Sequence, residues 1–103
     1  MKPNHYTEIP PSFEIQLETL SDYDIHKHIS ARGIKMLRPI DIEVASIVKV
    51  SVKQISLTGD VSFLVKVLKS TKLENEPLFE IYANFYDTNG EKEDEVLSFM
   101  KSF

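Results

Sequence analysis

The residues best suited to chemistry lie in one short polar stretch. Acidic and imidazole side chains occupy alternate positions there, at Asp22, Asp24, His26 and His28. Successive side chains of an extended strand point to opposite faces, so these four would share one face. Imidazole and carboxylate groups together can ligate a divalent metal such as zinc. A solvated strand face also consists of polar residues. We therefore expect no metal here and keep a metal protein or enzyme as an alternative.

Other catalytic arrangements find little support. Gly33, Gly59 and Gly90 each stand alone in predicted turns, without the spacing of a nucleophile elbow or a phosphate-binding loop. The chain has no cysteine, which excludes disulfides, thiolate metal sites and cysteine nucleophiles. Glu80 lies in an apolar stretch, but a charge that protects a strand edge is the preferred interpretation. We predict a non-enzymatic protein without a cofactor.

An aromatic segment near the C-terminus is the candidate binding surface. Residues 79–86 include Phe79, Tyr82, Phe85 and Tyr86, and the segment is apolar at both odd and even positions. Strands of this kind are covered on both faces. A helix of about 12 residues spans only about 18 Å and would leave part of the surface uncovered. We predict that these four residues contact a polypeptide or a second subunit.

Alternating apolar and polar residues predict an antiparallel sheet of four to five strands in a meander or Greek key. The expected strands cover 13–20, 61–70 and 78–86, and 40–52 is one long strand or two joined by a bulge near Ala45. Residues 31–33 indicate a break. Residues 1–12 contain three prolines and predict an extended arm before a single domain over 13–103.

The period changes after Gly90. Val96, Met100 and Phe103 have helical spacing, and Thr88 and Glu91 have the spacing of a capping box. We therefore expect an α+β fold with a C-terminal helix over 91–103. The Asn89-Gly90 pair is also a hairpin signal, and a final strand would give an all-β immunoglobulin-like sandwich, an interaction domain.

Composition limits the classes of partner. The 103 residues are 42% hydrophobic and carry a net charge of −4, which argues against nucleic acids and anionic membranes as partners. No apolar run approaches the roughly 20 residues of a membrane span, and we predict a cytoplasmic protein. A chain of this length buries only about two-thirds of its unfolded surface, so we expect a homo-oligomer.

The order of these features resembles the SecB-like export-chaperone fold. The comparable pieces are the segment Phe13 to Leu17, the stretches IVKVSVKQ and VSFLVKV on either side of Thr58-Gly59-Asp60, and LFEI leading to EDEVLSFMKSF. The resemblance covers about residues 13–103 and consists of pattern without a specific motif. It implies an oligomer whose exposed apolar grooves hold unfolded polypeptide. That family continues through a longer helical region and is usually more acidic.

Overall fold

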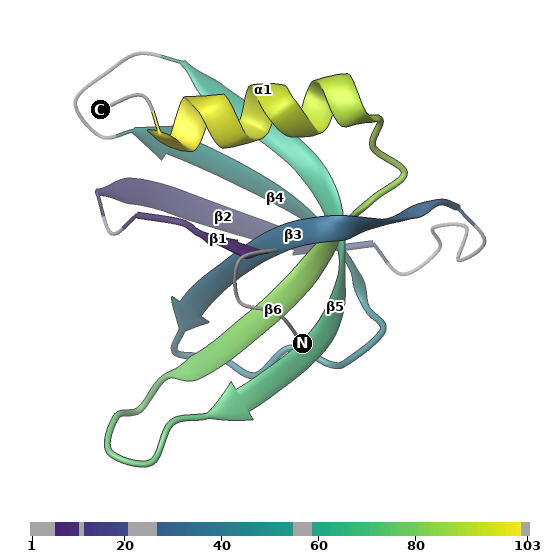
Figure 1. The fold of residues 1–103 in the computed structure, drawn as a ribbon. Helices are drawn as coiled ribbons and strands as arrows, with labels where there is room; N and C mark the ends of the chain where they lie inside the picture. The colour runs from purple at the N-terminus through teal and green to yellow at the C-terminus, as the bar shows by residue number, and fades with distance from the viewer. Residues whose placement is uncertain (1–5, 11, 21–26, 55–58, 102–103) are drawn as a thin grey trace.

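The computed structural model describes residues 6–10, 12–20, 27–54 and 59–101. Within them, six strands form one mixed sheet in the order β1-β3-β6-β5-β4-β2, and one helix follows (Figure 1). The elements are β1 (Tyr6–Glu8), β2 (Phe13–Thr19), β3 (Ile29–Arg38), β4 (Ile47–Gln54), β5 (Asp60–Lys72), β6 (Phe79–Tyr86) and α1 (Gly90–Lys101). The α+β class is confirmed. The expected strand count and wholly antiparallel pairing were wrong.

The N-terminal arm accounts for the extra strand. Tyr6 to Glu8 pair in parallel with β3, and Glu8 lies opposite Lys35. The chain then turns, with the Phe13 backbone N–H donating to the Pro10 carbonyl oxygen at 3.1 Å, and enters β2. Strands β1 and β2 are at opposite ends of the strand order, yet only residues 9–12 join them. The sheet therefore curls until its two edges approach each other, without closing into a barrel.

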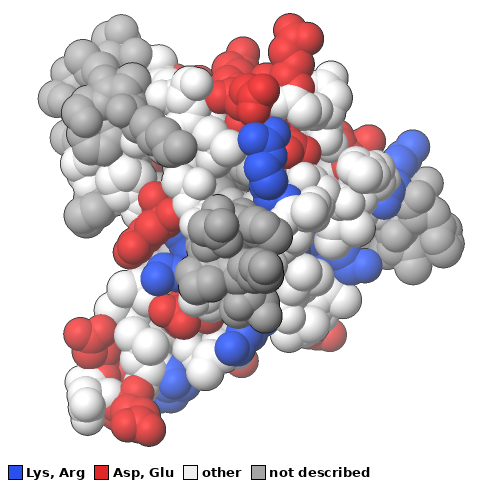
Figure 2. Space-filling model, viewed as in Figure 1, with Lys and Arg blue, Asp and Glu red and all other residues white. Residues whose placement is uncertain are grey.

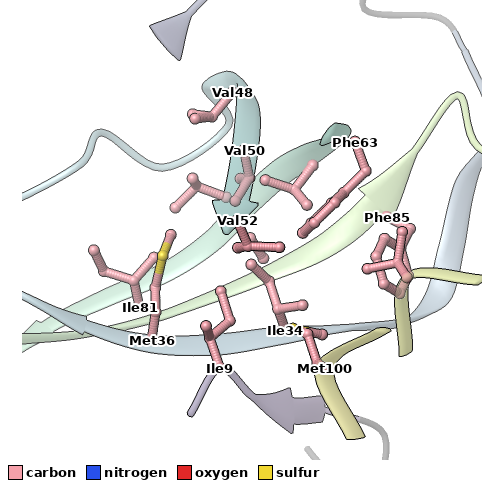
Figure 3. Packing of buried hydrophobic residues seen from close by; sticks show 14 of the residues in the cluster. Ile9, Ile34, Met36, Val48, Val50, Val52, Phe63, Ile81, Phe85 and Met100 are labelled. Carbon is pink, nitrogen blue, oxygen red and sulfur yellow. The ribbon is translucent and has the colours of Figure 1, made fainter. Parts of the chain in front are cut away.

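The core lies on the inner face of this curled sheet. The strand register aligns even positions of β4 with odd positions of β5, as in Val50 opposite Phe63. Apolar side chains from all six strands or their ends meet there, and α1 adds Val96 and Met100. Figure 3 shows part of this cluster, with Met100 of α1 near Ile34 of β3. Because both helix residues are almost fully buried, α1 covers part of the inner face.

The expected strand over 40–52 was partly wrong, because β4 begins only at Ile47. A turn precedes it, with the Ser46 N–H donating to the Glu43 carbonyl at 3.2 Å and Ala45 at a φ of 76°. This turn rotates the chain out of strand geometry. Ile42 is consequently buried, whereas Ile40 and Val44 are more than half exposed and do not share its face.

Ala45 offers a test of this turn. A left-handed backbone conformation is unfavourable for a residue with a Cβ and favourable for glycine. We expect Ala45→Gly to raise the free energy of unfolding by about 0.5 kcal/mol, since the relieved strain exceeds the added flexibility of the unfolded chain. Urea denaturation measures this change. A loss of stability would show that the turn does not strain Ala45.

The expected break at 31–33 was also wrong, because β3 runs through these residues. Its pairing with β6 shifts register between Ile29 and Gly33 and then continues regularly to Arg38 opposite Phe79. A bulge adds a residue to a strand without ending it. The glycine at position 33 therefore serves packing within the sheet and is not a turn residue.

The C-terminal helix is confirmed over Gly90–Lys101, and the all-β alternative is wrong. The cap differs from the expected Thr88 and Glu91 pair. The Asn89 side-chain oxygen accepts the Lys92 backbone N–H at 2.7 Å, which makes Asn89 the N-cap. The Thr88 hydroxyl instead donates to the Tyr86 carbonyl at 2.8 Å.

Candidate functional site

Two of the four aromatic residues predicted to bind a partner lie in the interior. Phe85 is fully buried and meets Phe63 edge-to-face, with ring centroids 5.4 Å apart. Tyr86 is 1% exposed, and its hydroxyl accepts the Lys27 backbone N–H at 2.8 Å. Buried aromatic rings contribute large contact areas to a core. Both residues therefore pack the folded chain, and neither offers a surface to a partner in this conformation.

The other two, Phe79 and Tyr82, are half-buried and lie on opposite faces of β6. Tyr82 packs edge-to-face on Tyr6 at 5.1 Å between centroids, and the Lys69 ammonium lies 5.9 Å from the Tyr82 ring. Desolvation raises the pKa of the Tyr82 phenol, and the nearby Glu80 carboxylate raises it further. The phenol therefore stays neutral at physiological pH. The four aromatic residues do not form one continuous surface.

The alternative metal cluster falls largely outside the described residues. This applies to Asp22, Asp24 and His26, whereas His28 is described and exposed. The His28 carbonyl accepts the Asp87 N–H at 2.8 Å. Within the described part of the chain, no three His, Asp or Glu side chains gather as metal ligands would. Glu80 pairs with Lys35 at 3.7 Å on the outer face.

The feature that sequence reasoning missed is a cavity of about 380 Å³ between the two edges of the sheet. We call it the seam. Residues from the end of β1, from the link and start of β2 and from the end of β3 line it, namely Glu8, Ile9, Pro10, Phe13, Ile15, Met36, Leu37 and Arg38. Its lining is mostly apolar and its volume lies at the small end of ligand clefts, which span about 300–1,000 Å³.

Strand β3 presents unpaired backbone groups to the seam. Glu8 lies opposite Lys35 in the parallel β1–β3 pair, and the Lys35 carbonyl accepts the Ile9 N–H at 3.1 Å. The Lys35 backbone groups therefore face β1. Backbone direction repeats every second residue, so the N–H and C=O of Leu37 face the same side. Since β1 ends at Glu8, no described residue is paired with Leu37 at this edge.

Strand β2 presents a second free edge. The Leu20 N–H donates to the Ile47 carbonyl at 2.9 Å, and the register continues from there as Thr19 opposite Val48. Even residues of β2 therefore bond to β4, and the backbone groups of Ile15 and Leu17 point away from it. Among the described residues, β4 is the only strand paired with β2.

Arg38 adds a charge to the seam. Its side chain is half-buried, and its Nε is a buried donor without a hydrogen-bond partner among the described residues. No described carboxylate is paired with its guanidinium either. An unsatisfied buried N–H costs about 1–3 kcal/mol, so an acceptor that reached this group would be favoured. The seam thus combines apolar walls, two open strand edges and one unpaired cation.

Comparison with protein-family models, with curated proteins and with solved structures found no match. Among the described residues, no helix is both long and apolar enough to cross a membrane.

Proposed function

We propose that this protein is a non-enzymatic binding module that takes up extended polypeptide by strand addition in the seam. The observation that carries the proposal is the pair of open edges. Leu37 lies on one side and Ile15 on the other, and the free edge of β2 continues beyond the seam to Leu17. An added strand would satisfy these backbone groups, and its side chains would meet the apolar lining. This mode of binding needs neither a cofactor nor a catalytic group.

The charge of the molecule supports polypeptide over nucleic acid or an anionic membrane as the ligand. The net charge is −4. On the face shown in Figure 2, acidic side chains gather beside helix α1, and Lys and Arg lie scattered among other residues. Nucleic-acid surfaces need clustered basic residues. We place the protein in the cytoplasm, where a chain without cysteine loses no stabilising disulfide.

A second copy of the chain fits the β2 edge less well than a foreign strand. The outer row of β2 consists of exposed Glu14, Gln16 and Glu18. In a symmetric antiparallel pair centred on Gln16, Glu14 of each copy would face Glu18 of the other, and like charges directly opposite are destabilising. The homo-oligomer expected from chain length stays a prediction, which light scattering after size exclusion tests.

Proline substitution tests strand addition directly. Leu17→Pro removes an N–H from the free edge of β2, two residues beyond Ile15, and leaves the β4 hydrogen bonds in place. We expect at least a tenfold loss of binding to a synthetic library of octapeptides with alternating apolar and polar residues. Mass spectrometry of peptides retained on immobilised protein measures it. Leu17→Ala, which shortens the side chain but keeps the N–H, is the matched control and should retain binding.

The neighbouring position checks the assignment of the edge. Glu18→Pro removes an N–H that bonds to β4, so it should lower the free energy of unfolding by about 3 kcal/mol, clearly more than Leu17→Pro. Equal stabilities of the two proline variants would show that the edge is assigned wrongly. A wild-type protein that retains no peptide, or equal retention by Leu17→Pro and Leu17→Ala, would refute strand addition.

A further inference from the structure

We infer that the seam recognises the carboxyl terminus of its polypeptide, with Arg38 binding the terminal carboxylate. This inference rests on the proposed function and deepens it. Three features carry it. Ile9 and Pro10 close one end of the seam, Arg38 lies beside that end without a hydrogen-bond partner for its Nε among the described residues, and the walls are apolar.

The closed end is formed by Ile9 and Pro10, the two residues that follow β1. Ile9 is held to β3 by its hydrogen bond to Lys35, and Pro10 starts the turn that crosses to β2. Residues on both sides of this pair line the same cavity. The space next to Leu37 is therefore the first that a new strand can occupy. A strand that runs antiparallel to β3 would have its carboxyl end at this pair.

Arg38 follows Leu37 directly and lines the cavity. A guanidinium presents Nε and a terminal nitrogen as a fork that matches the two oxygens of a carboxylate. A terminal carboxylate that drew the Arg38 side chain toward itself would satisfy the Nε donor, which has no acceptor among the described residues. A backbone carbonyl offers a single uncharged oxygen, so it matches the fork less well than a carboxylate does.

The charges at the closed end favour a carboxyl terminus over an amino terminus. A terminal ammonium group would lie near the Arg38 cation and would need a carboxylate partner. Glu8 is the only carboxylate among the described residues that line the seam, and it lies 4.0 Å from the Lys35 ammonium. Lys35 also pairs with Glu80 at 3.7 Å, so both carboxylates already lie near a cation.

The lining also indicates the last side chain of the ligand. Ile9, Phe13 and Met36 are buried residues whose side chains contribute to the cavity wall. A short apolar side chain at the terminal residue would bury apolar area against them. We therefore expect ligands that end in an aliphatic residue with a free carboxylate.

Three synthetic octapeptide libraries test the inference on the full chain. All three share the same alternating positions: the first ends in a free carboxylate, the second in an amide, and the third in an amide with one internal Glu. We expect immobilised wild-type protein to retain at least tenfold more of the first library than of either other. Arg38→Met should remove this difference and keep a thermal midpoint no lower than that of wild type. Arg38→Lys should keep part of it.

The outcomes separate the two proposals. Equal retention of the carboxylate and amide libraries, lost in Leu17→Pro, would overturn terminal recognition and leave strand addition intact. Preference for the internal Glu library would also overturn it, because the carboxylate would then come from a side chain. Retention of none of the libraries would overturn both proposals. An unchanged preference in a folded Arg38→Met variant would overturn the role of Arg38.

Discussion

Gly33→Ala is expected to lower the free energy of unfolding by about 3 kcal/mol, as for a severe case of overpacking. Gly33 lies between β1 and β6, opposite Tyr6 on one side and Asn84 on the other. A Cβ at this position would collide with the Ala83 carbonyl oxygen and come within 2.7 Å of the Asn84 Cα. These atoms are backbone atoms of a central strand, so they cannot rotate away as a side-chain tip would.

Gly90→Ala is the matched control, measured by the same urea denaturation. A Cβ at Gly90, the first residue of α1, would meet no atom within 4 Å. Both substitutions reduce the flexibility of the unfolded chain to the same degree, so this effect cancels in the comparison. Gly90→Ala should be neutral or slightly stabilising. Two variants of equal stability would mean that β3 and β6 can separate at Gly33 without cost.

Elements with a strong period could be predicted from the sequence. In β5 apolar and polar residues alternate, and Val61, Phe63 and Val65 are buried on one face. In α1 the spacing of apolar residues changes to that of a helix.

Gly33 was misinterpreted as a turn residue. The sequence alone does not distinguish a glycine needed for close backbone contact from a glycine in a turn. Ile42 was wrongly placed on one strand face with Ile40 and Val44. The turn that separates them depends on the positive φ of a single residue, Ala45, which the hydrophobic pattern does not predict.

The seam could not be predicted because it depends on which strands become neighbours. Its two sides come from residues 13–15 and 36–38, and sequence alternation says which face a residue occupies but not which strand lies beside it. Two signals pointed weakly toward it. Pro10 separates two short extended segments, and Arg38 is a cation directly after the apolar pair Met36 and Leu37. The aromatic segment 79–86 was the more obvious candidate, but most of its apolar side chains are buried in the core.

A buried carboxylate on helix α1 bonds to two residues of strand β3. The Glu93 side chain is 5% exposed and accepts hydrogen bonds from the Ser30 hydroxyl at 3.1 Å and from Arg32 Nε at 2.9 Å. Arg32 Nη2 lies 2.9 Å from the same oxygen, and Nη1 donates to Asp94 at 3.0 Å. Hydrogen bonds to Asp94 and Glu93 raise the pKa of Arg32, which keeps it charged. Because Asp94 is 71% exposed, solvent screens its pair, and Glu93 matters more for stability.

Arg32→Met is expected to lower the free energy of unfolding by about 2 kcal/mol. Methionine keeps most of the aliphatic stem but leaves the Glu93 carboxylate buried with Ser30 as its remaining partner described here. Breaking a buried ion pair from one side costs about 3–5 kcal/mol, and the 41% exposure of the Arg32 side chain places this pair below that range. Thermal denaturation followed at the helical circular-dichroism band measures the loss.

The reverse substitution should be milder, and this asymmetry is the sharper result. Glu93→Met removes the buried charge itself and leaves Arg32 half-exposed beside Asp94, so we expect a loss of less than about 1 kcal/mol. The double variant Arg32→Met/Glu93→Met should be more stable than Arg32→Met alone, because no buried carboxylate remains. Asp94→Asn is the control for the exposed pair and should change stability by less than about 0.5 kcal/mol. If Glu93→Met proved as damaging as Arg32→Met, the loss of stability would come from lost contacts between helix and sheet. It would then not come from a buried charge without a partner.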